Sequence, residues 1–324
     1  MKLNELVFRD LLIGSDYTEF REMIGASSKL ASAPDALKAD IENLKQYIDT
    51  QANSGRSEFS VVYDSRLYRV TVAARLGADI EKKAYVIRQT PSETYPIEKL
   101  GISQSLIDII RDSTSSGLVL IAGGLGHGKT STAASILYER NQSTGSVSVA
   151  IEDPIETQLD GRHGDGRCIQ IEVNENEGYA AALKKTLRMG ASNMLIGEIR
   201  DGDTAHEALK ASLNGMFVIT TIHAKSPIDA IERMIVLCNE RSSEAQRILS
   251  KSLLIVMHQT LESVTDTSGV IKKKTPNIQG YAIAQKYNLI NGQVMEAKIA
   301  RGDIASLKTE FDSYKKAIMN NTRG

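Results

Sequence analysis

The chain has 324 residues, 41% of them hydrophobic, which is enough apolar material for two domains with cores of ordinary size. Its 39 lysines and arginines balance its 40 aspartates and glutamates, so the strong basic field of a protein that coats nucleic acid is excluded, and we expect no nucleic-acid partner. The two cysteines, Cys168 and Cys238, form no CxxC pair, which excludes a structural zinc module and favours two buried, apolar thiols.

The sequence shows neither a signal peptide nor an apolar run long enough to span a membrane. Residues 1–16 lack the basic start and the continuous apolar core of a signal peptide. The longest late apolar run, Leu253–Met257, is far too short to cross a bilayer. We therefore expect a cytoplasmic protein without a membrane span.

The first third of the chain has the pattern of a small α+β domain. Apolar residues recur at helical spacing between Pro34 and Asp49, which predicts an amphipathic helix. Three β-rich runs follow, at residues 59–64, 67–73 and 83–90. The short turn at 64–66 predicts that the first two of these runs form a hairpin.

A linker is predicted from Thr90, where TPSETYPIEKLGIS contains two prolines and little periodicity. We place a domain boundary within it and expect domains at 1–96 and 97–324. Beyond it, apolar β-runs alternate with helical ones, which favours an α/β domain with a mostly parallel sheet covered on both faces. Strands are predicted at 117–123, 146–151, 193–199 and 217–223, and helices at 131–140, 179–190, 204–215 and 226–238.

A phosphate-binding loop is predicted at GGLGHGKT, where Gly123, Gly128, Lys129 and Thr130 fit G-x-x-x-x-G-K-[ST] between a strand and a helix. Backbone N–H groups and the helix N-terminus favour bound anions. Lys129 is expected to reach the β- and γ-phosphates of ATP, and the Thr130 hydroxyl to ligate Mg²⁺. The residues expected to contact ATP are Gly123, Gly124, Leu125, Gly126, His127, Gly128, Lys129, Thr130 and Ser131.

Hydrolysis also needs groups that position water and support the metal, and acidic residues follow two predicted strands. Glu152 and Glu156 lie at the end of SVSVAIEDPIE, and Glu198 lies at the end of NMLIGEIRD. His223 follows a third strand, FVITTIH. Because the carboxyl ends of parallel strands line the ligand crevice, we expect these groups to lie near the phosphate loop.

The Gly-rich stretch from Asp160 to Arg167 predicts an exposed, mobile loop. A metal site at His163 with Asp160 and Asp165 is the less favoured alternative, since the spacing matches no standard site.

Several motifs in order resemble one family, the secretion and type IV pilus motor ATPases: GGLGHGKT, IEDPIE, LIGEIRD and TTIHA. The resemblance covers most of residues 59–240, and LYRVTVA, YVIRQTPSE and KLGI resemble the family's N-terminal domain and linker. It implies a RecA-like ATPase domain after a PAS-like N-terminal domain, assembled into a homo-oligomeric ring of six subunits. It also implies a peripheral place at the inner membrane, on a platform protein.

The resemblance implies a role for each matching residue. Glu156 corresponds to the water-activating glutamate and Glu198 to the Walker B residue that supports Mg²⁺. His223 corresponds to the retained residue of the His box. The N-terminal arginines that reach a neighbour's nucleotide, and a further candidate in the EIRD run, correspond to Arg88, Arg69, Arg75 and Arg200.

The chain departs from the family pattern at several positions. Gly124 and Leu125 replace the usual Walker A proline and threonine, and His127 replaces a serine. Met216 replaces the first His-box histidine, and Asp203 replaces a glutamate.

Four functions follow as expectations, and a pilus retraction motor is favoured among them. The chain lacks the four-cysteine zinc element of assembly motors, so it resembles the short pilus retraction ATPases or the related ATPases of conjugation and type IV secretion. The alternatives from other classes are a RecA-like DNA motor and a non-enzymatic, nucleotide-binding regulator.

Overall fold

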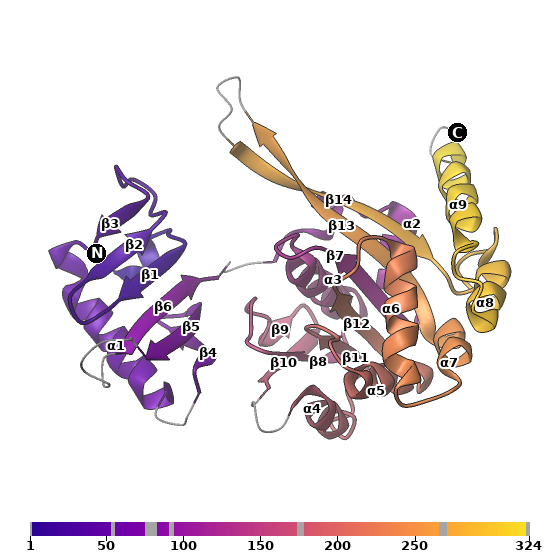
Figure 1. Ribbon diagram of the computed structural model, residues 1–324, viewed down its shortest axis with the longest axis horizontal. Helices are drawn as coiled ribbons and strands as arrows, with labels where there is room; N and C mark the ends of the chain where they lie inside the picture. Colours follow the sequence, from indigo (N-terminus) through magenta and orange to yellow (C-terminus); the bar gives the residue numbers. More distant parts are fainter. Residues whose placement is uncertain are drawn as a thin grey trace. The chain divides into compact units, whose positions relative to one another are not determined.

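The computed structural model describes residues 2–52, 56–74, 83–90, 94–173, 178–265 and 271–321. The chain divides into two compact units (Figure 1). The first unit comprises Met1–Glu93 with the short segments Asp153–Gln158 and Glu172–Asn176. The second unit comprises Thr94–Glu152, Leu159–Ile171 and Glu177–Gly324.

The first unit contains a six-stranded antiparallel sheet in the order β3-β2-β1-β6-β5-β4. Its strands are β1 (Asp10–Ile13), β2 (Thr18–Arg21), β3 (Leu30–Ser32), β4 (Glu58–Tyr63), β5 (Arg66–Ala74) and β6 (Lys83–Gln89). Helix α1 (Lys38–Ala52) and the short 3-10 helices η1 (Leu3–Glu5) and η2 (Asp35–Leu37) complete it. The core joins one face of the sheet to α1, because Phe20, Phe59 and Ile87 from strands and Leu44 and Ile48 from the helix are all buried in one cluster.

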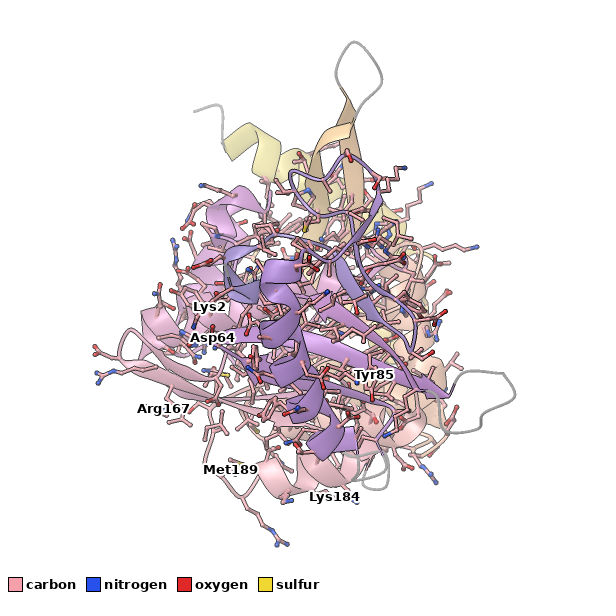
Figure 2. All side chains as sticks on the ribbon, turned by 90° about the vertical axis from the view of Figure 1, so that its left-hand side faces the viewer. Lys2, Asp64, Tyr85, Arg167, Lys184 and Met189 are labelled. Atoms are coloured by element: carbon pink, nitrogen blue, oxygen red, sulfur yellow. The ribbon has the colours of Figure 1, made fainter. Side chains whose placement is uncertain are left out.

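The predicted helix and hairpin of this unit are confirmed. Helix α1 buries residues that recur at helical spacing, Ile41, Leu44 and Ile48. Strands β4 and β5 pair around a turn in which Asp64 and Ser65 both have positive φ, the geometry that a two-residue hairpin turn requires. The Nζ atom of Lys2, near the start of the chain, forms an ion pair of 3.1 Å with Oδ2 of Asp64 in this turn (Figure 2).

The second unit contains an eight-stranded sheet in the order β14-β13-β7-β12-β11-β8-β10-β9. Its strands are β7 (Gly117–Gly123), β8 (Val147–Glu152), β9 (Gly161–His163), β10 (Gly166–Glu172), β11 (Asn193–Ile196), β12 (Phe217–Ile222), β13 (Leu253–Thr265) and β14 (Ile271–Ala282). Strands β13, β7, β12, β11 and β8 pair in parallel, while β14 and β9 pair antiparallel with β13 and β10. The predicted parallel sheet is therefore confirmed.

Two groups of helices cover this sheet (Figure 1). One group packs α3 against β7, β11 and β12, and the other packs α5 and α6 against β7, β12 and β13. The helices are α2 (Gln104–Arg111), α3 (Lys129–Thr144), α4 (Gly178–Thr186), α5 (Gly202–Leu213), α6 (Pro227–Asn239), α7 (Ala245–Ser252), α8 (Gly292–Arg301) and α9 (Leu307–Asn321), with the 3-10 helix η3 (Ile97–Lys99). No helix within the described ranges is long and apolar enough to cross a membrane.

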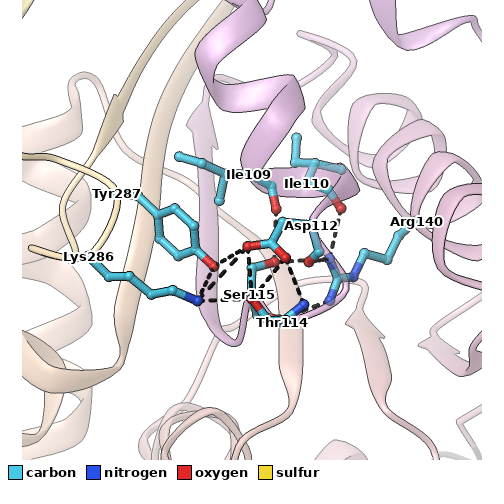
Figure 3. Close-up of polar contacts among 8 residues, drawn as sticks. All are labelled: Ile109, Ile110, Asp112, Thr114, Ser115, Arg140, Lys286 and Tyr287. Carbon is cyan, nitrogen blue, oxygen red and sulfur yellow. Dashed lines mark hydrogen bonds and ion pairs between the residues drawn. The ribbon is translucent and has the colours of Figure 1, made fainter.

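A polar network fixes the chain before β7 (Figure 3). Buried Arg140 on α3 donates to the carbonyl oxygens of Ile110 and Ser115 and stacks on an aromatic ring. The Asp112 carboxylate accepts hydrogen bonds from Thr114 and, at 2.7 Å, from the hydroxyl of Tyr287. These contacts join α2, α3 and the segment after β14 at the amino ends of the parallel strands.

The prediction of a mobile loop from Asp160 to Arg167 is wrong. Strands β9 and β10 pair there as a hairpin, and Gly164 has the positive φ of a tight turn. The His163 ring is engaged in other contacts: its Nε2 lies 2.6 Å from the carbonyl oxygen of Leu159, and the ring packs on Tyr138. Among the described residues it belongs to no metal-binding group. A Gly-rich composition suits this hairpin because glycine tolerates the turn geometry.

Candidate functional site

The phosphate loop connects the carboxyl end of β7 to the first turn of α3, as the motif predicts. Strand β7 is buried along its whole length, and Gly128 forms the N-cap of α3 with a left-handed φ of 80°. A 16-residue helix therefore points its N-terminus at the loop. The exposed N–H groups and the helix dipole make this position favourable for an anion.

Lys129 contacts both the loop and the end of a neighbouring strand. Its Nζ donates to the carbonyl oxygen of Gly124 at 2.9 Å and lies 3.4 Å from Nδ1 of His223. Lys129 is buried, so water screens its positive charge less than that of an exposed lysine, and its attraction for an anion in the loop is stronger.

His223 connects the loop to the carboxylate predicted at the end of the neighbouring strand. Its Nε2 lies 3.1 Å from Oε1 of Glu198. One neutral imidazole satisfies both of its contacts, because Nδ1 can accept from the Lys129 ammonium while Nε2–H donates to Glu198. The other carboxylate oxygen of Glu198 lies 3.2 Å from Arg200. The structure thus brings together four residues that the sequence singled out.

The strand register explains this convergence. Ile196, the last residue of β11, pairs with Thr220 on β12, and Ile222 pairs with Ala122 on β7. The residues after these parallel strands therefore emerge at one edge of the sheet, where parallel α/β folds bind ligands.

Oxygen ligands for a magnesium ion are available at this edge. Thr130 supplies a hydroxyl and Glu198 a carboxylate, which are the hard ligands that Mg²⁺ accepts. Across the described ranges no group of three or more His, Cys, Asp or Glu side chains forms a metal site. This donor set fits an ion that completes its shell with water and substrate phosphate rather than one caged by protein.

The other predicted catalytic residues lie in the first unit. Glu156 is in its segment Asp153–Gln158, and Oε1 of Glu156 accepts a hydrogen bond from the Arg69 guanidinium. Arg88 on β6 is the direct cross-strand neighbour of Arg69 on β5. Arg75 lies outside the described residues.

Glu152, the last residue of β8, is almost fully buried. Its Oε1 accepts a hydrogen bond of 2.9 Å from the side-chain amide of Gln170 on β10. This contact ties β8 to the hairpin that replaced the predicted loop.

The departures from the family pattern fall at distinct places. Leu125 is at the exposed tip of the loop, and Nδ1 of His127 lies 3.2 Å from the amide nitrogen of Gly124. Met216 directly precedes β12, so the length of this six-residue strand, roughly 20 Å, separates it from the loop edge. Asp203 lies at the start of α5 and forms an ion pair with Arg241.

Sequence reasoning missed a buried residue that contacts the loop directly. Gln259 on β13 donates to the carbonyl oxygen of His127 and accepts from the hydroxyl of Thr132 on α3, both at 2.7 Å. Only the apolar run before Gln259 signals a buried strand, and nothing in that run indicates that the strand lies beside β7.

The fold and the loop together define the class: a RecA-like P-loop domain of mixed α/β structure, accompanied by a smaller α+β domain. The chain belongs to the family described as type II/IV secretion system protein, whose profile matches residues 62–299.

Relatives by sequence include a pilus retraction ATPase and a competence protein. The "Type IV pilus retractation ATPase PilT" of Pseudomonas aeruginosa is 34% identical over 180 residues, which are 54% of this chain and 51% of that protein. The "Competence protein ComGA" of Bacillus subtilis is 32% identical over 163 residues, 48% of this chain and 44% of that protein. The chain thus spans about half the length of these relatives.

Solved structures share the fold over nearly the whole chain. The pilus retraction motor PilT with bound ADP has a TM-score of 0.74 and 22% identity, covering 95% of this chain and 90% of that one. The ATPase DotB of Legionella pneumophila has a TM-score of 0.71 and 19% identity, covering 98% and 92%. The predicted fold class is confirmed by this likeness.

Proposed function

We propose that this chain is a Mg²⁺-dependent ATPase that drives a type IV pilus or secretion machine. The observation that carries the proposal is the contact series Lys129–His223–Glu198, which joins the phosphate loop to the ends of two parallel strands. Family membership and the PilT relative support the same activity. The series brings an ammonium, an imidazole and a carboxylate together at the sheet edge where parallel α/β folds bind ligands, which supports the proposal.

Residues of the second unit would bind the nucleotide. The loop amides and the ammonium of Lys129 would hold the phosphates, with the hydroxyl of Thr130 and the carboxylate of Glu198 holding Mg²⁺. When bound, the ion neutralises charge that develops on the phosphates. His223 lies between Lys129 and Glu198, and we propose that it would hydrogen-bond the terminal phosphate and respond to its loss.

Residues of the first unit would complete hydrolysis. We assign to Glu156 the orientation and deprotonation of the attacking water. Arg88, with Arg69 beside it, would approach the nucleotide of a neighbouring subunit and stabilise the transition state. This arrangement requires a ring, and we propose six subunits, each with an N-terminal domain at 1–96 and an ATPase domain at 97–324.

Phosphate release would free the N-terminal domain from the ATPase domain, turning hydrolysis into hinge motion against a platform protein at the inner membrane. We favour a retraction-type motor, because a relative named for pilus retraction matches more of this chain than ComGA does. Membership of the family described as type II/IV secretion system protein supports the second candidate, an ATPase of a conjugation or type IV secretion apparatus.

The test is steady-state hydrolysis of ATP by the purified full-length oligomer with Mg²⁺. Lys129→Ala should lose ATP affinity and turnover, whereas Lys184→Ala, at an exposed position of α4, should retain both. If the wild-type protein binds nucleotide but does not hydrolyse it, the chain is a regulator. If its turnover rises when DNA is added and falls steeply with salt, the chain is a DNA motor. Mass measurement with and without an ATP analogue tests the ring of six.

A further inference from the structure

Gln259 forms a buried connection between the phosphate loop and the strand beside it. It lies on β13 in parallel register with Gly123, the first glycine of the loop motif. Its side chain is buried, and both ends of its amide are used: Nε2 donates to the carbonyl oxygen of His127, and Oε1 accepts from Thr132 Oγ1. The amide therefore connects His127 in the loop to Thr132 in the first turn of α3.

Gln259 also packs closely against two glycines of the loop. A Cβ atom at Gly123 would lie 2.5 Å from the carbonyl oxygen of Gln259, a distance that no real side chain tolerates. A Cβ atom at Gly128 would lie 3.1 Å from Nε2 of Gln259. The loop is thus packed directly onto this glutamine at both ends of the motif.

The bond to His127 also sets the direction of a neighbouring N–H group. In a trans peptide the C=O and N–H bonds point in opposite directions. Because Gln259 holds the His127 carbonyl toward β13, the N–H of Gly128 is turned toward the opposite side of the loop. That amide begins the helix N-terminus at which phosphate-binding loops hold their anion.

We infer that Gln259 is a positioning residue of the nucleotide site: it holds the phosphate loop in its anion-binding conformation by anchoring the His127 carbonyl. The inference rests on the proposed function, since it assumes that the loop binds ATP or ADP. It assigns a role in nucleotide affinity to a side chain outside the four motifs of the family resemblance. The oxygen of the same amide accepts a separate hydrogen bond from Thr132 on α3.

The test is the Kd of Mg²⁺–ADP, measured on the full-length protein so that hydrolysis does not intervene. Gln259→Glu keeps the acceptor for Thr132 but places an oxygen against the carbonyl oxygen of His127. Gln259→Met has a similar length and loses the donor without burying a charge. Both substitutions should weaken ADP binding by about tenfold or more, roughly the effect of losing one well-placed hydrogen bond.

Thr132→Val is the matched control, because it removes the other hydrogen bond of the same amide and leaves the tie to His127. It should lower thermal stability while keeping the Kd within about threefold of wild type. A role in core packing alone predicts a lower Tm for Gln259→Met and Thr132→Val with the Kd of both unchanged. That result, or an equal loss of affinity in both, overturns the inference.

Lys129→Ala separates this inference from the proposed function. If Lys129→Ala binds ADP as wild type does, the loop is not the nucleotide site and the proposed function fails. If Lys129→Ala loses ADP while Gln259→Met binds normally, the proposed function stands and the positioning role of Gln259 is refuted.

Discussion

Nε of Arg88 donates a hydrogen bond of 2.8 Å to Oδ1 of Asp10, whose side chain is fully buried. Asp10 is the cross-strand partner of Arg88 and also of Arg21, with which it forms a second ion pair. Because directly opposite residues share one face of a sheet, Arg21, Asp10, Arg88 and Arg69 form a row across four strands. The buried carboxylate fixes the orientation of Arg88 in this row.

On the role proposed for Arg88, its replacement by alanine (Arg88→Ala) should abolish most ATP hydrolysis. An arginine that acts on a neighbour's nucleotide contributes roughly 10³- to 10⁵-fold to turnover, so a loss of that order is expected with ADP affinity little changed. Asp10→Asn should give a smaller loss, because it keeps Arg88 but weakens the charged hydrogen bond that orients it. Steady-state turnover and ADP binding measured side by side distinguish these effects.

Mixed oligomers test whether Arg88 acts between subunits. When Arg88→Ala and Glu156→Gln proteins are combined, some interfaces receive an intact arginine from one subunit and an intact glutamate from the other. Turnover should then rise above that of either variant alone. The absence of rescue at every mixing ratio would count against action in trans.

Glu156→Gln should bind ATP and scarcely hydrolyse it, because the amide cannot accept a proton from water. Losing a general base lowers turnover by about 10²- to 10⁴-fold. Asp153→Asn is the control, since Asp153 is an exposed carboxylate in the same segment and should leave turnover near wild type. Near-normal hydrolysis by Glu156→Gln would refute the role assigned to it.

His223→Asn should separate affinity from turnover. The shorter amide cannot bridge Lys129 and Glu198, while Lys129 keeps its bond to the Gly124 carbonyl. We expect the Kd for ADP to change by less than about threefold and kcat to fall by roughly tenfold or more. A KM that rises with kcat unchanged would show that His223 serves binding alone.

Local sequence patterns predicted the part of the site that depends on local structure. The glycine loop, Glu198 and His223 each follow an apolar strand directly, so the alternation of strands and helices was enough to place them at one edge. Gln259 was out of reach because its bond to His127 joins residues 132 positions apart and depends on which strand lies beside β7. No spacing rule within a single segment contains that information.

Other features were missed because local sequence carries too little information about them. Strands β1–β3 are only three or four residues long, too short for alternation to be recognised. Glu152 is the last residue of β8, and Glu156 comes only four residues after it. Yet Glu152 is buried beside Gln170, whereas Glu156 packs with the first unit, a division that tertiary contacts alone determine.

The two cysteines provide a prediction about chemical reactivity. Cys168 on β10 and Cys238 on α6 are buried, and burial raises the pKa of each thiol to about 12. Because the thiolate is the nucleophile, neither should react with a thiol reagent at pH 8 in the folded protein, and both should react in denaturant. Rapid labelling of either residue in the native state would contradict their placement.

The hydrogen bond from Tyr287 to Asp112 makes a prediction about stability at low pH (Figure 3). This bond, followed by those from Thr114, lowers the pKa of Asp112 to about 2. The pKa of an unfolded aspartate is about 3.9, so the contribution to stability is fully present above that pH. It is lost as pH falls toward 2, where the folded carboxyl also becomes protonated.

Tyr287→Phe removes the donor and leaves the ring in place. It should lower the free energy of unfolding by about 1 kcal/mol at pH 7, a modest value because Asp112 is partly exposed and screened by solvent. The difference from wild type should shrink as pH falls below about 4. Urea titrations at pH 7 and pH 3, with ADP affinity as a control for the distant loop, measure both quantities. A difference that grows on acidification would show that Asp112 is not the partner through which Tyr287 stabilises the fold.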